Sequence, residues 1–378
     1  MRHKMVHRRN ISIVFIISVF LLLPWNIVHS EEQQPEQKNE EQKTEKFNPG
    51  TFIFEHVEDA YSWHIFSINH KDGHSTEVAI PLPVILYSRH SGLHVFLSSR
   101  LEHGHASWKN FSLAHEGPEK GKIVETLPDG TQVRPLDFSI TKNVVAIFVS
   151  VLLMLWMFLS VAKAYERNPN QPPRGLQSAL EPFILFIRDD IAKPLIGEKK
   201  YERFMPYLLT LFFFIWINNM MGLIPIFPGG ANVTGNIAVT MVLALFTFII
   251  TSVSGNRDYW LHMINMPGVP WWLKIPLPLM PFIEIMGMFT KPFVLMVRLF
   301  ANILAGHIIA LGFFSLIFIF GEMHPAFGYG ISVISILFTV FMGLLELLVA
   351  LIQAYVFTLL SALYFGMATA EHAHEEHT

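Results

Sequence analysis

The chain has 378 residues, of which 52% are hydrophobic and 15% are charged, with a formal net charge of −3 and a mean hydropathy of +0.40. This composition is typical of a membrane protein, and the negative charge argues against a nucleic acid as partner. Because the chain contains no cysteine, disulfides, thiolate metal sites and cysteine nucleophiles are excluded.

Residues 1–30 predict a secretory signal peptide. Four basic residues precede the apolar run "ISIVFIISVFLLL", and Val28 and Ser30 fit the small-residue pattern of a cleavage site. The run is shorter than a membrane helix requires, so we expect a bacterial precursor whose mature N-terminus is exported; an uncleaved anchor is the alternative. Residues 31–46 carry no apolar side chain and predict a disordered linker.

Residues 47–140 predict a small, mostly β exported domain. Four β-prone runs, at 62–68, 76–88, 93–99 and 122–127, are separated by turn sequences such as KDG and PDG. The region contains nine histidines, and some are spaced as metal ligands can be: His70/His74, His90/His94 and His103/His105. Because cysteine is absent and the context is extended, we expect solvated or locally hydrogen-bonded histidines and no metal site. The same expectation holds for His372, His374 and His377.

Residues 141–370 predict an all-α polytopic membrane domain, followed by a cytoplasmic tail at 371–378. Five apolar runs are long enough to cross a bilayer, at 144–162, 206–224, 233–254, 281–320 and 328–368. The last two are about twice as long as a crossing needs, so we expect two tilted helices packed as a hairpin, with kinks at Pro281 and Pro292 or surface-lying ends. Residues 176–197 mix apolar and charged side chains, which predicts an amphipathic helix on the cytoplasmic membrane surface.

The distribution of lysine and arginine orients these helices. Basic residues occur between the first and second spans and between the third and fourth, whereas "PIFPGGAN" and "GEMHPAFGYG" contain neither Lys nor Arg. Because basic loops stay in the cytoplasm, the five spans predict a multi-pass protein of the bacterial inner membrane, with a periplasmic N-terminus and a cytoplasmic C-terminus.

Several polar residues fall within the last two apolar runs, and they are Glu284, Lys291, Arg298, Asn302, His307, Glu346 and Gln353. An arginine near mid-bilayer costs roughly 2.5–3.5 kcal/mol on insertion scales, so it calls for a functional explanation. Arg298 and Asn302 are four residues apart and share a helix face, and so do Glu346 and Gln353, seven residues apart. Antiparallel packing of the two helices would bring these two polar stripes together.

These polar residues either stabilise the bundle by internal pairing or line an ion pathway, and the full set favours the pathway. His307 and Glu346 suit a proton relay, since both can titrate near neutral pH when their surroundings shift them. Arg298 keeps its proton and is therefore a fixed charge, which can attract a carboxylate or block the passage of a proton.

The last two spans resemble the a subunit of F-type ATP synthases, on "KPFVLMVRLFANILAGHIIAL" and "FMGLLELLVALIQAYVFTLLSALY". The segments "INNMMGLIP" and "GANVTGNIAVT" extend the resemblance over most of residues 140–372. It implies a non-catalytic stator subunit without a cofactor, which couples proton flow to rotation of the c-ring and so drives ATP synthesis. The implied partners are the c-ring, with a c-subunit carboxylate opposite Arg298, the b subunit of the peripheral stalk, and membrane lipid.

The resemblance also implies roles for the other polar residues. Asn302, His307, Glu346 and Gln353 match positions that line the exported-side half-channel and surround the arginine, whereas Glu284 and Lys291 match the rim of the cytoplasmic half-channel. Three positions depart from the family pattern. His307 and Glu346 are exchanged relative to members that have an acid first and a histidine second, Ala301 replaces the commoner Gly, and Gly222 stands where some members carry a carboxylate.

Two other classes of protein remain open from the residues alone. A secondary transporter would use the same buried charges for substrate and proton exchange, but it predicts inverted repeats or interrupted helices, which the sequence does not show. A membrane-anchored exported metal-binding protein would give the β-like domain the main role, but it leaves Arg298 unexplained.

Overall fold

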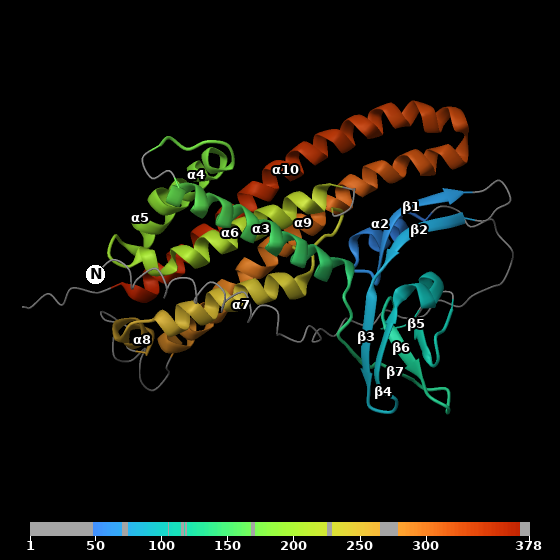
Figure 1. Ribbon diagram of the computed structural model, residues 1–378, viewed down its shortest axis with the longest axis horizontal. Coiled ribbons are helices and arrows are strands. Elements are labelled where there is room, and N and C mark those ends of the chain that lie inside the picture. Colours follow the sequence, from blue (N-terminus) through green and yellow to red (C-terminus); the bar gives the residue numbers. More distant parts are fainter. Residues whose placement is uncertain are drawn as a thin grey trace, which may run out of the picture. The chain divides into compact units, whose positions relative to one another are not determined.

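A computed structural model describes residues 48–69, 75–104, 106–114, 117, 119–167, 171–224, 229–264 and 279–370 (Figure 1). The predicted signal peptide, linker and C-terminal tail lie outside the described residues, and so do His70, His74 and His105. The chain forms two compact units. The first contains Met1–Val149, Ile224–Asn232 and Leu311–Thr339, and the second contains Ser150–Leu223, Val233–Ala310 and Val340–Thr378.

The N-terminal part of the first unit is mostly β, as its alternating apolar runs predict. In the described residues of this part, a helix comes first and three antiparallel sheets follow, with strand orders β1-β2, β4-β3-β8 and β5-β6-β7. The elements are α2 (Pro49–Val57), β1 (Ser62–Asn69), β2 (Ser75–Pro81), β3 (Pro83–Ser88), β4 (Gly92–Leu97), the 3-10 helix η1 (Ser98–Gly104), β5 (Phe111–Leu113), β6 (Ile123–Thr126), β7 (Gln132–Val133) and β8 (Leu136–Asp137).

The four runs predicted as strands contain strands, but the run at 76–88 is divided at Leu82 into β2 and β3, which belong to different sheets. Side chains of β3, β4 and β6 form a common core with residues of η1 and β5. Its buried members are Val84, Leu86, Phe96, Leu101, Phe111 and Ile123. Alternation along β3 places Val84 and Leu86 inside, as expected for a strand with one covered face. The sequence reading missed α2 and the two- or three-residue strands β5, β7 and β8, because such short elements carry too few residues to show a period.

A buried carboxylate joins the β region to the first membrane-capable helix, α3 (Lys142–Arg167). Asp59 accepts hydrogen bonds from the Thr141 hydroxyl (2.7 Å) and the Asn143 backbone N–H (3.0 Å), while the Lys142 N–H donates to the Ala60 carbonyl (2.9 Å). Asp59 thus satisfies donors that the first turn of a helix leaves open. Burial raises the pKa of Asp59, and the hydrogen bonds from Thr141 and Asn143 offset part of that rise.

From Lys142 on, the described chain consists of helices joined by short connections. After α3 come α4 (Leu176–Phe186), the π-helix η2 (Ile187–Ala192), α5 (Lys193–Ile196), α6 (Tyr201–Leu223), α7 (Ile237–Ser254), α8 (Arg257–Ile264), α9 (Leu279–Met323) and α10 (Pro325–Thr369). Among the described residues, five helices have the length and apolarity to cross a membrane, and they are α3, α6, α7, α9 and α10. These are the five predicted spans. The third starts later than predicted, because the Asn236 side chain caps α7 by accepting from the Ala238 N–H (2.9 Å).

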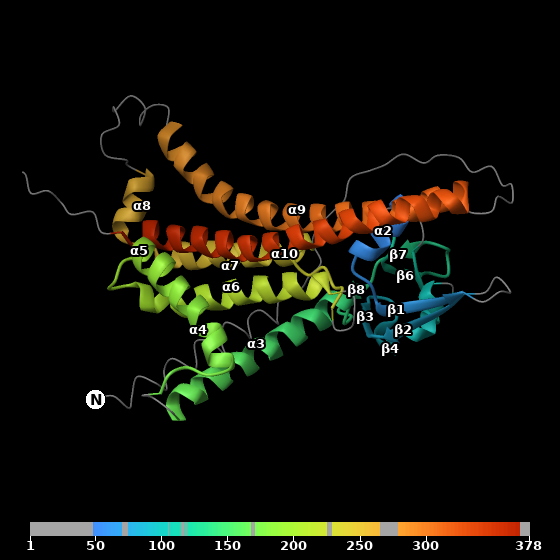
Figure 2. The same ribbon diagram turned by 90° about the horizontal axis from the view of Figure 1, so that it is seen from above.

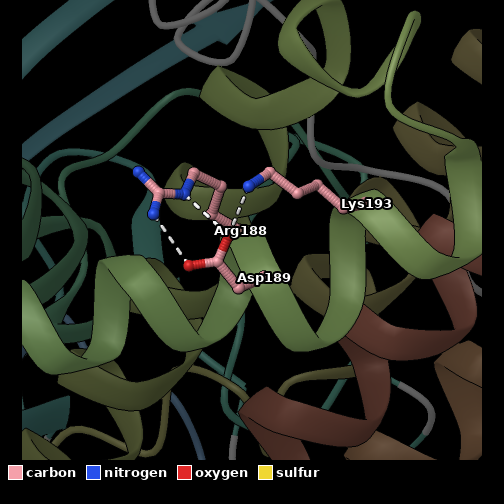
Figure 3. Close-up of polar contacts among 3 residues, drawn as sticks. All are labelled: Arg188, Asp189 and Lys193. Carbon is pink, nitrogen blue, oxygen red and sulfur yellow. Dashed lines mark hydrogen bonds and ion pairs between the residues drawn. The ribbon is translucent and has the colours of Figure 1, made fainter.

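The segment from α4 to α5 has the two-sided character predicted for residues 176–197. Ile187 and Ile191 are fully buried, whereas Arg188, Asp189 and Lys193 lie on the outer side. Figure 3 shows the Asp189 carboxylate between the other two, accepting from Arg188 Nη2 (2.7 Å) and Lys193 Nζ (2.6 Å). These two hydrogen bonds hold the pKa of Asp189 well below its usual range.

Helices α9 and α10 form the predicted antiparallel hairpin, side by side in Figures 1 and 2. Each has 45 residues, or roughly 67 Å, about twice the hydrocarbon thickness of a bilayer. Phe313 stacks on Phe338 with ring centroids 5.1 Å apart, and near the turn a Cβ on Gly328 would lie 2.8 Å from the Gly321 Cα. Helix α9 is continuous through Pro281 and Pro292. Pro281 lies in its first turn, where no N–H partner is lost, whereas Pro292 lies in its interior.

Candidate functional site

The polar residues of α9 lie on two sides of the helix within the second unit. Arg298 and Asn302 are exposed, while Leu295, Leu299 and Ile303 on the other side of the helix are almost fully buried. The i, i+4 spacing therefore does place both polar side chains on one face, and that face points away from the interior of this chain. Among the described residues, no carboxylate forms an ion pair with Arg298.

His307 and Glu346 form the central polar contact between α9 and α10. The His307 Nδ1 atom pairs with the Glu346 Oε1 atom, and Glu346 is only 7% exposed. Gly306 makes room for this carboxylate, because a Cβ at that position would lie 2.9 Å from Glu346 Oε1. The hairpin thus brings together two groups that are 39 residues apart in sequence, as the antiparallel arrangement predicts.

Gln353 lies two turns beyond Glu346 on α10. Since the helices are antiparallel and residue 307 faces residue 346, seven further residues along α10 reach the level of Arg298 and Asn302 on α9. Gln353 is 7% exposed, so its amide is held among packed side chains. The prediction that the two polar stripes meet is therefore wrong. Glu346 and Gln353 are buried, whereas Arg298 and Asn302 lie on the outer face of α9, because the covered side of that helix is its apolar side.

A second set of buried polar groups lies on α6 and the segment before α7, and the sequence reading did not assign it to the site. Asn219 donates from Nδ2 to the Ala350 carbonyl of α10 (3.2 Å) and accepts from the Thr234 hydroxyl. Asn218 donates to the Ser150 hydroxyl (3.0 Å). The sequence signal was present, since two asparagines interrupt an apolar run there. The partners of these asparagines depend on how α6 is rotated in the bundle, and the sequence alone does not give that rotation.

Lys291 and Glu284 lie on α9 about two and four turns before Arg298. Lys291 is one of nine residues lining a small cavity between α7, α8, α9 and α10, together with Thr247, Phe248, Thr251, Tyr259, Met288, Pro292, Tyr364 and Met367. The Lys291 ammonium lies 5.8 Å from the centroid of the Tyr364 ring. Burial raises the pKa of Tyr259, and the Glu284 carboxylate raises it further, so Glu284 lies near the same cavity.

The described residues contain no group of three or more His, Asp or Glu side chains that could hold a metal ion. His94 is locally bonded, as expected, with its Nε2 atom 3.1 Å from the Ser91 carbonyl oxygen and its ring against Phe111. The Glu125 carboxylate beside it accepts from the hydroxyls of Ser88 and Ser91. Burial would raise the pKa of Glu125, but these two hydrogen bonds outweigh burial and lower it.

Comparison with known proteins separates the chain into two regions. The profile described as "ATP synthase A chain" matches residues 144–366, and that of a domain of unknown function (DUF8433) matches residues 52–138.

Three relatives illustrate the match. The chain is 42% identical to ATP synthase subunit a of Chloroherpeton thalassium over 253 residues (65% of this chain and 70% of that one) and 45% identical to ATP synthase subunit a 2 of Chlorobaculum tepidum over 253 residues (65% and 68%). It is 41% identical to ATP synthase subunit a of Myxococcus xanthus over 279 residues (72% and 86%).

Proposed function

The chain belongs to the bacterial F-type ATP synthase subunit a family, and we propose that Arg298 is the fixed charge at which its proton path is divided. Membership makes it a multi-pass membrane subunit with a role in proton transport and ATP synthesis. The roles of individual residues, given below, are our proposal. The observation that carries it is an arginine in an apolar helix whose charge faces outward, on the same helix as the half-buried His307 that contacts Glu346.

Arg298 acts on a carboxylate of the c-ring. A carboxylate facing lipid has to be neutral, since an isolated ion in hydrocarbon is strongly destabilised. Opposite Arg298 it loses its proton, because a unit positive charge at about 4 Å contributes roughly 4 kcal/mol at an effective dielectric constant near 20. This attraction favours ionisation and yet is weak enough to be broken as the ring turns. The permanent charge also prevents protons from passing directly between the two half-channels.

His307 and Glu346 deliver protons to that carboxylate from the exported side. The His307 imidazole contacts the Glu346 carboxylate, and imidazole and carboxyl groups are the side chains that most often transfer protons. Asn302 and Gln353 lie at the next level of the hairpin and provide amide groups that both donate and accept hydrogen bonds. On the cytoplasmic side, Glu284 and Lys291 line the rim through which the proton leaves, beside the cavity between α7 and α10.

The proposed orientation places residues 47–140 in the periplasm, the membrane domain at 141–370 in the inner membrane, and the tail in the cytoplasm. One compact unit contains the β region, the α6–α7 connection and the α9–α10 turn. Neither the connection nor the turn contains Lys or Arg, and that is the composition of exported segments. The c-ring packs against the Arg298 face of α9, and the b subunit of the peripheral stalk and lipid cover other surfaces of the membrane domain.

Arg298→Ala in the reconstituted complex tests the proposal. We expect ATP-driven proton pumping to be lost, while the complex assembles and its soluble part still hydrolyses ATP. Arg167→Ala is the matched control, because Arg167 is an exposed arginine at the end of α3, and it should leave pumping unchanged. Coupled pumping at the wild-type rate by Arg298→Ala would overturn the proposal.

A further inference from the structure

The β region contains a lysine in a backbone conformation that lysine rarely adopts. Trp108 and Phe111 exchange two backbone hydrogen bonds (2.9 and 3.0 Å), which leaves Lys109 and Asn110 as a two-residue hairpin loop. Lys109 has φ +54°, the left-handed region for which such loops normally select glycine or asparagine. A side chain kept at a strained position is a reason to look for a function.

Lys109 lines an open surface recess of about 520 Å³, whose walls combine polar side chains with apolar surface. The described lining residues are Ser107, Lys109, Asn110, Ser112, Thr126, Leu127 and Pro128. They provide three hydroxyl groups and one amide, and Lys109 carries the only charge among them. The Thr126 N–H donates to the Asn110 carbonyl (2.8 Å), so the two sides of the recess are held together by the backbone.

Two cations gather beside this recess on one aromatic ring. The Lys109 ammonium lies 4.6 Å from the centroid of the Trp108 ring, and the Arg100 guanidinium carbon lies 5.3 Å from it. Trp108 is itself held against Phe96, with ring centroids 4.3 Å apart. No described carboxylate forms an ion pair with either cation, so the positive charge at the edge of the recess is uncompensated within the described part of the chain.

We propose that this recess binds an acidic saccharide, with its carboxylate on Lys109 and its hydroxyl groups on Ser107, Ser112, Thr126 and Asn110. Hydroxyl and amide side chains both donate and accept, which matches the alternating donors and acceptors of a sugar. The volume falls within the range of small-molecule sites and exceeds what a bare inorganic anion would fill. Nothing in the ion pathway of the membrane domain depends on this site.

The test measures binding of a glucuronic-acid-containing disaccharide to the full chain by calorimetry. Lys109→Gly removes the ammonium and at the same time supplies the residue that the loop conformation favours. We expect at least about tenfold weaker binding in this variant, since a hydrogen bond to a charged group is worth a factor of that size. Its Tm should be no lower than that of the wild type, which separates loss of the ligand contact from loss of the fold.

Lys120→Ala is the matched control, because Lys120 is an exposed lysine of the same region, and its affinity should equal that of the wild type. A neutral disaccharide of the same size should bind at least about tenfold more weakly than the acidic one. Three results would each overturn the proposal. They are no binding of the acidic disaccharide by the wild type, equal binding by Lys109→Gly, and inorganic phosphate binding as tightly as the disaccharide.

Discussion

Glu346→Gln separates the proton relay from the packing of the hairpin. Glutamine has the shape of the glutamate and still offers an oxygen that can accept from His307, so the contact between α9 and α10 is kept. The amide cannot take up or release a proton at physiological pH. We therefore expect ATP-driven proton pumping to fall at least about tenfold, because an effective general acid–base group contributes about two orders of magnitude or more.

The stability of the complex should change little in this variant, because one neutral hydrogen bond replaces a partly charged one, at a net cost of about 1 kcal/mol. Glu346→Ala is the contrasting variant. It removes the partner of a half-buried histidine and leaves a cavity beside Gly306, so it should lower both pumping and Tm.

A reversed pair provides the most specific control. In the double variant His307→Glu and Glu346→His the same two groups meet with their positions exchanged. We expect it to recover pumping relative to either single variant, with a non-additivity of about 1–3 kcal/mol in the double-mutant cycle. Pumping at the wild-type rate by Glu346→Gln would refute the relay, because that variant cannot carry the proton.

Three further predictions concern packing and pH. Gly306→Ala should reduce pumping because its Cβ displaces the Glu346 carboxylate, and it should lower Tm less than Glu346→Ala does, because alanine gains helix propensity; Gly287→Ala, which meets open space on the same helix, should leave pumping unchanged. Asn219→Ala should lower the free energy of unfolding by about 1–3 kcal/mol, as judged by denaturant titration, because it removes the side-chain donor to the Ala350 carbonyl and the acceptor of the Thr234 hydroxyl. In the β region, the folded-state pKa of Asp59 is raised, so its contribution to stability declines as pH rises from the unfolded pKa near 3.9 through the folded pKa. The folded-state pKa of Glu125 is lowered, so the contribution of Glu125 to stability is present above its unfolded pKa near 4.3 and is lost as pH falls through the folded pKa. We therefore expect the slope of the free energy of unfolding against pH, measured between pH 3 and 8, to change in opposite directions from the wild type in Asp59→Asn and Glu125→Gln. The same change of slope in both variants would contradict the two pKa shifts.

The hairpin of α9 and α10 shows why part of the site could be predicted from sequence. Long apolar runs specify membrane-capable helices through length alone, and the i, i+4 and i, i+7 spacings place Arg298, Asn302, Glu346 and Gln353 on faces without knowledge of the fold. An antiparallel connection of two helices joined by a short turn then requires residues near 307 and 346 to meet.

Other features depend on tertiary packing, and so the sequence alone did not reveal them. Whether Arg298 faces inward or outward follows from which side of α9 is covered, and both sides of that helix are apolar. The contact of Asn219 with α10 depends on the rotation of α6. The sequence does not distinguish Lys109 from other exposed lysines, because its distinctive feature is a positive φ angle.

The outward face of Arg298 is the central claim, and a cysteine cross-link tests it most directly. Because the chain has no native cysteine, each introduced one is unique in the subunit. Ala301 is exposed beside Arg298, whereas Ile303 is 3% exposed on the covered side. Paired with a cysteine one turn from the c-subunit carboxylate, Ala301→Cys is expected to form a disulfide with the ring under mild oxidation, and Ile303→Cys is not. A cross-link from Ile303→Cys without one from Ala301→Cys would contradict the account.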